Sequence, residues 1–268
     1  MSEKENMKYL YISIIFCISC NAPAQTEKEI RTMNDVLAAD SNSVYLSSIL
    51  KKAIPDSADE NFLKNYTELK SSIQTRRLKL YQKYIAATTE AQKRSVLDSS
   101  AFFLHEALVS NIFPFWYGTA WDFNGISNEP QHGQIACGYF VSTTLKHCGV
   151  NLNRYKVAQQ YSHSIVKTLC TNVSTFTDVE KLLSDISSKP SQLYVVGLDN
   201  HVGFISNQNG KITFVHSTFV GDVCVITENA DESLVLKNSN VYVLGNLSGN
   251  DALLLNWLKA TPVVVKYQ

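Results

Sequence analysis

Residues 201–216 have the sequence HVGFISNQNGKITFVH, which predicts a β-hairpin. Asn209 and Gly210 form the two-residue loop that type I′ turns prefer, with strand-forming residues on both sides. This register pairs Gly203 with His216, and the other facing pairs it predicts are Gln208 with Lys211 and Ile205 with Phe214. Because strand side chains alternate, His201 shares a face with Gly203, so the two histidines meet diagonally. A slip of one residue would separate them.

Residues 133–141, GQIACGYFV, predict that a helix begins at Cys137 and continues over 137–147. The backbone N–H groups and the dipole of a helix N-terminus favour a thiolate, so we expect a lowered pKa for the Cys137 thiol. Gly138 is expected to leave the approach to the thiol open. Cys148 lies at the opposite end of the helix and is expected to be a packing residue.

A cysteine nucleophile needs a base, and the base needs a group that orients it. Cys137, His201 and His216 supply these three roles in that order. The alternative is that both histidines are structural, because a single histidine on a strand usually satisfies a local hydrogen bond.

The rest of the chain has a helical first part and a strand-rich second part. Helices are expected at about 57–85, opened by a capping box over 57–60, and at about 90–109. Aromatic residues over 112–125 are expected to form a cleft wall. Further helices are expected at 155–169, from 177 onward and at 251–258, with strands at 192–197, 201–206, 211–217, 222–227 and 240–244. The pattern predicts an α+β fold, with a helical region over 25–95 and a catalytic domain over 96–268.

The first 24 residues have the features of an export signal in the usual order. A short apolar run at 9–18 follows a basic residue and precedes small residues, and it is too short to span a bilayer. Two processing routes stay open, cleavage near Ala22–Ala24 and lipid attachment at Cys20. A third interpretation is a buried strand or helix of the mature fold. Either route predicts an exported protein, in the periplasm or as an outer-envelope lipoprotein of a bacterium.

Charge and cysteine content exclude two classes of partner. Lys and Arg total 24, as do Asp and Glu, and no basic run is present, so we expect no nucleic-acid partner. Four cysteines follow the signal, Cys137, Cys148, Cys170 and Cys224. They form no CxxC pair and no histidine pair has zinc spacing, so we expect no metal and no cofactor.

The order of these motifs resembles the NlpC/P60 family of papain-like cysteine peptidases. That family has an aromatic Pro-Tyr-x-x-Gly segment, then Asp-Cys-Ser-Gly-Phe, then His-hydrophobic-Gly, then a hydrophobic-His pair. The similar segments of this chain are Pro114–Gly118, Ala136–Val141, His201–Ile205 and Val215–Ser217. The resemblance spans about 113–217. It implies a papain-like fold in which the catalytic cysteine, at a helix N-terminus, packs on an antiparallel sheet.

The chain departs from the family pattern at three places. Ala136 replaces the acid before the nucleophile, and Gly138-Tyr139 replaces Ser-Gly. Phe115 stands where the family has a tyrosine that assists the oxyanion, and Tyr117 or Gln131 would have to substitute for it. The candidate oxyanion and substrate-binding residues are Tyr117, Trp121 and Gln131. For the two aromatic residues, core packing is the alternative.

The resemblance implies an exported cysteine hydrolase that cleaves an amide bond of a peptidoglycan stem peptide. Cys137 would attack the carbonyl, His201 would transfer the proton and His216 would orient His201, while the backbone N–H of Cys137 would bind the oxyanion. Two alternatives stay open. The same triad would serve acyl transfer or cleavage of a protein substrate, or the chain would be an inactive scaffold that binds cell-wall peptides or an envelope protein.

Overall fold

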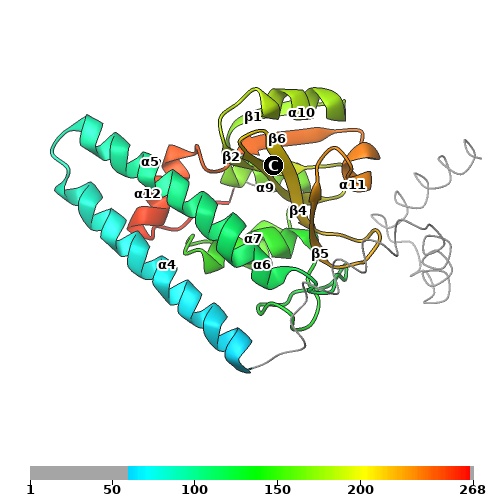
Figure 1. Cartoon of the computed structure of the whole chain (residues 1–268), viewed down its shortest axis with the longest axis horizontal. Helices are drawn as coiled ribbons and strands as arrows, with labels where there is room; N and C mark the ends of the chain where they lie inside the picture. Colours follow the sequence, from blue (N-terminus) through cyan, green and yellow to red (C-terminus); the bar gives the residue numbers. More distant parts are fainter. Residues whose placement is uncertain (1–59, 266–268) are drawn as a thin grey trace, which may run out of the picture. The chain divides into compact units, whose positions relative to one another are not determined.

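The structure is a computed structural model that describes residues 60–265 (Figure 1). The predicted export signal, the lipid-attachment site at Cys20 and residues 57–59 of the predicted capping box lie outside the described residues. The described chain is a mixed α+β fold, as predicted. Within 60–265, no helix is both long enough and apolar enough to cross a membrane.

Helices dominate the first half of the described chain and strands the second. The helices are α4 (Glu60–Ala86), α5 (Glu90–Glu106), the π-helix η1 (Ala107–Ile112), α6 (Phe113–Trp116), α7 (Cys137–His147), α8 (Arg154–Ala158), α9 (Ser162–Leu169), α10 (Val179–Ser187), α11 (Leu234–Lys237) and α12 (Asp251–Lys259). The strands are β1 (Thr171–Phe176), β2 (Gln192–Gly197), β3 (Val202–Gln208), β4 (Lys211–Ser217), β5 (Val225–Asn229) and β6 (Tyr242–Asn246). They form one antiparallel sheet in the order β1-β6-β2-β3-β4-β5.

The helices α4 and α5 form a hairpin, and α12 packs against both (Figure 1). Tyr66, Ile73 and Leu80 recur every seven residues and are buried along one face of α4. These side chains belong to the same hydrophobic cluster as Phe140 of α7 and Phe204 of β3. The hairpin and the sheet therefore share a core, and the domain boundary predicted at 95/96 falls inside α5.

The helix predicted over 90–109 changes character before its expected end. The α-helical pattern stops at Glu106 and a π-helical turn follows over Ala107–Ile112. The turn leads directly into α6, where Pro114 occupies the first turn, a position at which proline's missing N–H is tolerated. The periodicity of the apolar residues did not reveal this wider turn.

The predicted hairpin register is confirmed. Gln208 pairs with Lys211 and Ile205 pairs with Phe214 across β3 and β4. Asn209 and Gly210 have φ values of 55° and 88°, the left-handed conformation that a type I′ loop requires at both positions. Strand β1 was not predicted, because its sequence TNVSTF is polar and lies largely exposed at the edge of the sheet.

The two faces of the sheet are covered by different helices (Figure 1). On one face, Phe204 and Val215 belong to the cluster that contains α7. On the other face, Ile205 and Phe214 pack in a second cluster that contains Leu182 of α10. Strand alternation places His201 and His216 on the side of this second cluster.

The single helix predicted over 155–169 is wrong, because the chain forms two helices there. The helix α8 ends at Ala158 and α9 begins at Ser162, with Tyr161 in an extended conformation between them. The break lets Ala158 approach α7 and lets the Ser162 hydroxyl donate to the carbonyl of Leu198 at 2.5 Å. Tertiary contacts at both ends therefore override a sequence that suits a continuous helix.

Candidate active site

Cys137 is the first residue of α7, as predicted. Hydrogen bonds fix the loop that precedes it. The N–H of Ala136 donates to the carbonyl of Gly125 at 2.8 Å, and the hydroxyl of Ser217 donates to the carbonyl of Ile135 at 2.6 Å. Because Ser217 ends β4, the strand that carries the second histidine also holds the loop before the thiol.

Gly138 serves close packing, and the expectation that it keeps the thiol open is wrong. A Cβ at Gly138 would lie 2.6 Å from the carbonyl oxygen of Ala158, closer than real Cβ atoms approach backbone. The glycine is buried and lets α8 lie against the first turn of α7.

Burial raises the pKa of the Cys137 thiol, contrary to the predicted decrease. Desolvation is the largest effect on this pKa. Hydrogen bonds from the backbone N–H groups of Val202, Gly138 and Cys137 itself lower the pKa, but by less than desolvation raises it. In this structure the candidate nucleophile is therefore a neutral thiol. Burial also raises the pKa of the other three thiols among the described residues, Cys148, Cys170 and Cys224, and these three and Cys137 are free.

The backbone beside the first histidine contacts the thiol at the end of the sheet. The backbone N–H of Val202 donates a hydrogen bond to the thiol of Cys137, and Val202 directly follows His201. His201 itself is 3 % exposed. Its Nδ1 atom is buried and has no hydrogen-bond partner within residues 60–265, so the imidazole and the thiol are not hydrogen-bonded to each other.

His201 and His216 are in direct contact, as the hairpin register predicted. Nε2 of His201 lies 2.8 Å from Nδ1 of His216, with the two rings nearly perpendicular. The His216 ring is fully buried and stacks on Phe214, with ring centroids 4.0 Å apart. A Cβ at Gly203 would lie 2.8 Å from the Cβ of His216, so the glycine leaves the room that this pair needs.

Glu228 on β5 extends the pair to a chain of three groups. Its Oε1 lies 3.1 Å from Nε2 of His216. Glu228 was not predicted from the sequence. The available signal was alternation on β5, where Glu228 faces Phe214 and therefore shares the side on which His216 lies.

The carboxylate of Glu228, at one end of this hydrogen-bonded series, determines which ring nitrogens of the two histidines carry protons. A carboxylate only accepts hydrogen bonds, so Nε2 of His216 carries the proton that it donates to Glu228. In neutral His216, Nδ1 is then an acceptor, and His201 donates to it from Nε2–H. Nδ1 of neutral His201 is left as an unprotonated base without a partner.

Both histidines are neutral near pH 7. Burial lowers the pKa of His201 well below its usual value, and the neighbouring His216 lowers it further. Burial also lowers the pKa of His216, although Glu228 acts in the opposite direction. The arrangement is therefore suited to general-base removal of a thiol proton rather than to a preformed ion pair.

Two aromatic rings cover the site. The ring of Phe219 lies 5.6 Å from that of His201, and the ring of Trp121 lies 5.8 Å from that of Phe219. Phe219 is 38 % exposed and was not identified from the sequence. Trp121 is thus near the site, in contact with the covering ring rather than with the histidines.

Tyr117 and Gln131 do not fit the oxyanion role expected of them. The amide nitrogen of Gln131 donates to the backbone carbonyls of Tyr117 and Phe115, which occupies its N–H groups. The ring of Tyr117 packs against the main core, and its hydroxyl interacts with Thr227. Burial raises the pKa of Tyr117 to about 12. Both residues lie in the segment that precedes Cys137.

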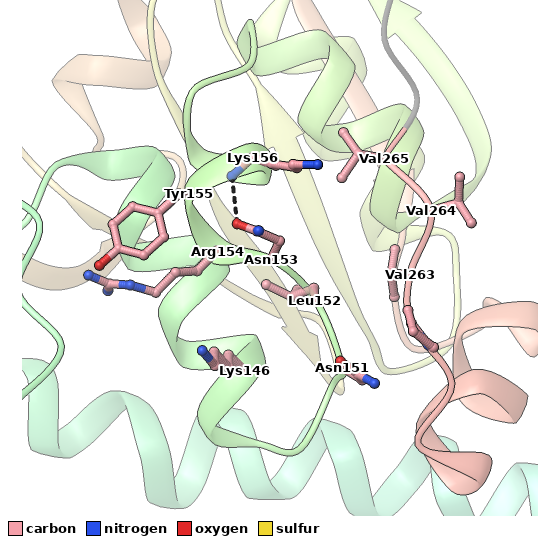
Figure 2. Close-up of a pocket in the computed structure, with 11 residues that line it drawn as sticks. Lys146, Asn151, Leu152, Asn153, Arg154, Tyr155, Lys156, Val263, Val264 and Val265 are labelled. Carbon is pink, nitrogen blue, oxygen red and sulfur yellow. Dashed lines mark hydrogen bonds between the residues drawn. The ribbon is translucent and has the colours of Figure 1, made fainter.

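A hollow of about 630 Å³ lies away from this site, between the segment 146–156 and the C-terminal segment 262–265 (Figure 2). None of Cys137, His201 and His216 lines it. Among the described residues, no cluster of three His, Cys, Asp or Glu side chains is placed to hold a metal ion.

Comparison of the chain with protein-family models, with curated proteins and with solved structures finds no match.

Proposed function

We propose that this protein is a cysteine hydrolase that cleaves an amide bond. Cys137 is the nucleophile, and Nδ1 of His201 is the base that removes its proton. The thiolate attacks the substrate carbonyl, and the backbone N–H of Cys137 stabilises the oxyanion. His201 then protonates the leaving amine, and water hydrolyses the thioester with His201 again acting as base.

His216 and Glu228 orient the base in this proposal. When His201 becomes positively charged, His216 accepts its Nε2–H and Glu228 stabilises the proton on His216. The observation that carries the proposal is the 2.8 Å contact between His201 and His216 together with the unpartnered, buried Nδ1 of His201. A purely structural histidine would have both nitrogens paired or solvated.

The substrate class follows from the resemblance to NlpC/P60 peptidases. The substrate would be a peptidoglycan stem peptide, and the fold a papain-like variant of that family. The export signal predicted for residues 1–24 agrees with a substrate in the bacterial envelope, whether the mature protein is secreted or lipid-anchored at Cys20.

The test is digestion of peptidoglycan and its soluble fragments by the mature protein, followed by mass spectrometry. Cys137→Ala is the inactive variant. Cys170→Ala is the matched control, because Cys170 is a buried thiol where α9 meets β1. New fragments from wild type and Cys170→Ala, but none from Cys137→Ala, are expected, and identical products from all three would exclude Cys137 as the nucleophile.

An inactive scaffold is the second candidate, and two observations favour it. Phe219 covers His201, and the pKa of the Cys137 thiol is raised, which is the state expected of a site that does not react. Binding of stem peptides by wild type without any cleavage would support the scaffold.

A further inference from the structure

The nitrogen that the proposed function uses as its base is shielded from solvent. Nδ1 of His201 is buried, and the whole side chain is 3 % exposed. A base that passes a proton to a leaving amine has to come within hydrogen-bond distance of that amine, about 2.6–3.2 Å. A substrate does not reach Nδ1 in this conformation, so the proposed reaction requires that a covering group move.

Phe219 is the covering group that meets solvent. Among the described residues, three aromatic rings pack edge-on against His201: His216 at 5.0 Å, Phe219 at 5.6 Å and Phe214 at 6.2 Å between ring centroids. His216 and Phe214 are fully buried, whereas Phe219 is 38 % exposed. Of the three rings, Phe219 is therefore the one whose movement would expose the imidazole.

The ring belongs to the segment 218–224, which connects β4 to β5 and which we call the β4–β5 loop. At the base of the loop, the N–H of Thr218 donates to the carbonyl of Cys224 at 2.8 Å, and the N–H of Trp121 donates to the carbonyl of Val223 at 2.9 Å. Between these anchors, the loop makes no hydrogen bond with any other element of the described chain. Movement of its tip therefore leaves the strand pairing intact.

The backbone of the β4–β5 loop is strained in the covering conformation. Val223 has a φ of 50°, in the left-handed region that a β-branched residue rarely adopts. Gly221, two residues earlier, has a φ of 73°, and a Cβ there would meet no atom within 4 Å. The strain at Val223 acts against the covering conformation, and Gly221 gives the loop a position at which the backbone turns freely.

We propose that the β4–β5 loop is a lid. Phe219 covers His201 in the free protein and is displaced when a substrate binds. The ring takes no part in the chemical step and acts only by closing the way to the base. The inference rests on the proposed function and describes how access to the same site is controlled.

The test measures how readily His201 is reached, which requires no cleavage activity. Diethyl pyrocarbonate acylates the unprotonated nitrogen of a neutral imidazole, which in the proposed site is Nδ1 of His201. Trypsin cleaves after Lys211, so His201 and His216 fall in different peptides, and mass spectrometry follows each one. We expect His201 of Phe219→Ala to react at least about 10-fold faster than His201 of the wild type. Equal rates would overturn the lid.

Two controls separate lid opening from a general loosening of the fold. Phe102→Ala makes the same truncation at an exposed ring of α5 and is expected to leave the rate at His201 unchanged. His147 is buried in the helical part of the molecule and should react slowly in every variant. An equal acceleration at His201 in Phe102→Ala would overturn the role of Phe219.

A second variant changes the rate in the opposite direction. Asparagine tolerates the left-handed region better than valine, so Val223→Asn relieves the strain that acts against the covering conformation. We expect His201 of this variant to react about 3-fold more slowly than in the wild type, or slower still. If Phe219→Ala also exposes His147, this variant decides: a slower reaction supports the lid, and an unchanged rate overturns it.

Cleavage of soluble peptidoglycan fragments separates the lid from the hydrolase. If both hold, Phe219→Ala should lower KM several-fold with kcat nearly unchanged, because the open state no longer has to be populated first. A lowered kcat at unchanged KM would show that the ring takes part in the chemical step and would overturn the lid. Faster acylation of His201 in Phe219→Ala without cleavage by any form of the protein would support the lid and reject the hydrolase. Cleavage with equal acylation rates would reject the lid and leave the hydrolase.

Discussion

Two buried histidine networks in this molecule differ in how they end. His201, His216 and Glu228 form a chain that has a carboxylate at one end and an unpartnered nitrogen at the other. The second network joins α4, α6 and α7. There, the hydroxyl of Tyr66 lies 2.8 Å from Nδ1 of His147 and accepts the indole N–H of Trp116 at 2.8 Å.

The difference teaches that burial of a histidine does not by itself mark a catalytic site. Burial lowers the pKa of His147 to about 3, and burial likewise lowers the pKa of His201 well below its usual value. Of these two histidines, only His201 has an unpartnered ring nitrogen, and the N–H of the next residue, Val202, contacts the Cys137 thiol. The first network is expected to control activity, and the second to control stability.

The largest expected effect is on the base. His201→Ala should lower kcat/KM for stem-peptide cleavage by about 1,000-fold or more, because the pKa of the Cys137 thiol is raised and the variant lacks the proposed base. His147→Gln should retain activity within a few-fold. Steady-state cleavage rates of the two purified variants provide the measurement, and equal losses would remove the distinction between the networks.

The next effect concerns Glu228. Glu228→Gln keeps the shape but lets an amide N–H donate to Nε2 of His216, which shifts the proton to Nδ1 of His216 and then to Nδ1 of His201. We expect a loss of about 100-fold in kcat with little change in KM. Glu228→Asp, which retains the carboxylate, should recover part of the rate. A Glu228→Gln enzyme with full activity would show that the carboxylate does not position the base.

A smaller effect is expected in the second network. Tyr66→Phe leaves the indole N–H of Trp116 and Nδ1 of His147 without their partner, which should cost about 1–3 kcal/mol in the free energy of unfolding. The value follows from urea denaturation of wild type and variant. Cleavage activity below the transition should be unchanged, whereas a large loss of activity would connect this network to the site.

Features of the fold and the site that are set by residues close together in the sequence could be predicted. The β3–β4 register followed from Asn209-Gly210 and from strand alternation, and it placed His201 beside His216 correctly. The start of α7 at Cys137 followed from its flanking residues. In each case a short-range signal fixed the geometry.

The predictions were wrong where contacts between residues far apart in the sequence determine the structure. The break between α8 and α9 depends on the approach of Ala158 to Gly138, which no local pattern encodes. The raised pKa of Cys137 depends on how much of the fold surrounds the thiol. Glu228 lies on a strand whose bounds were misplaced by a few residues, so its partnership with His216 was not visible in the sequence.

A further effect is expected on acid stability. Because His147 is neutral in the folded protein down to about pH 3 but titrates near 6.5 when unfolded, the unfolded state binds more protons in this window. The stability that neutral His147 contributes is therefore fully present above about pH 6.5 and is lost as the pH decreases. Lys70, Arg154 and Lys146 add to the lowering of this pKa.

His147→Gln should reduce the slope of stability against pH by up to about 1 kcal/mol per pH unit between roughly pH 6 and 4. Denaturation at a series of pH values measures it. An unchanged slope would show that His147 is not the group that titrates on unfolding.

In the proposed site, Glu228 and His216 leave Nδ1 of His201 unprotonated. Nitrogen-15 NMR of selectively labelled histidines at pH 7 tests it directly, because protonated and unprotonated ring nitrogens have distinct chemical shifts. We predict His201 with its proton on Nε2 in wild type, and on Nδ1 in Glu228→Gln. A proton on Nδ1 of His201 in the wild-type protein would contradict the account.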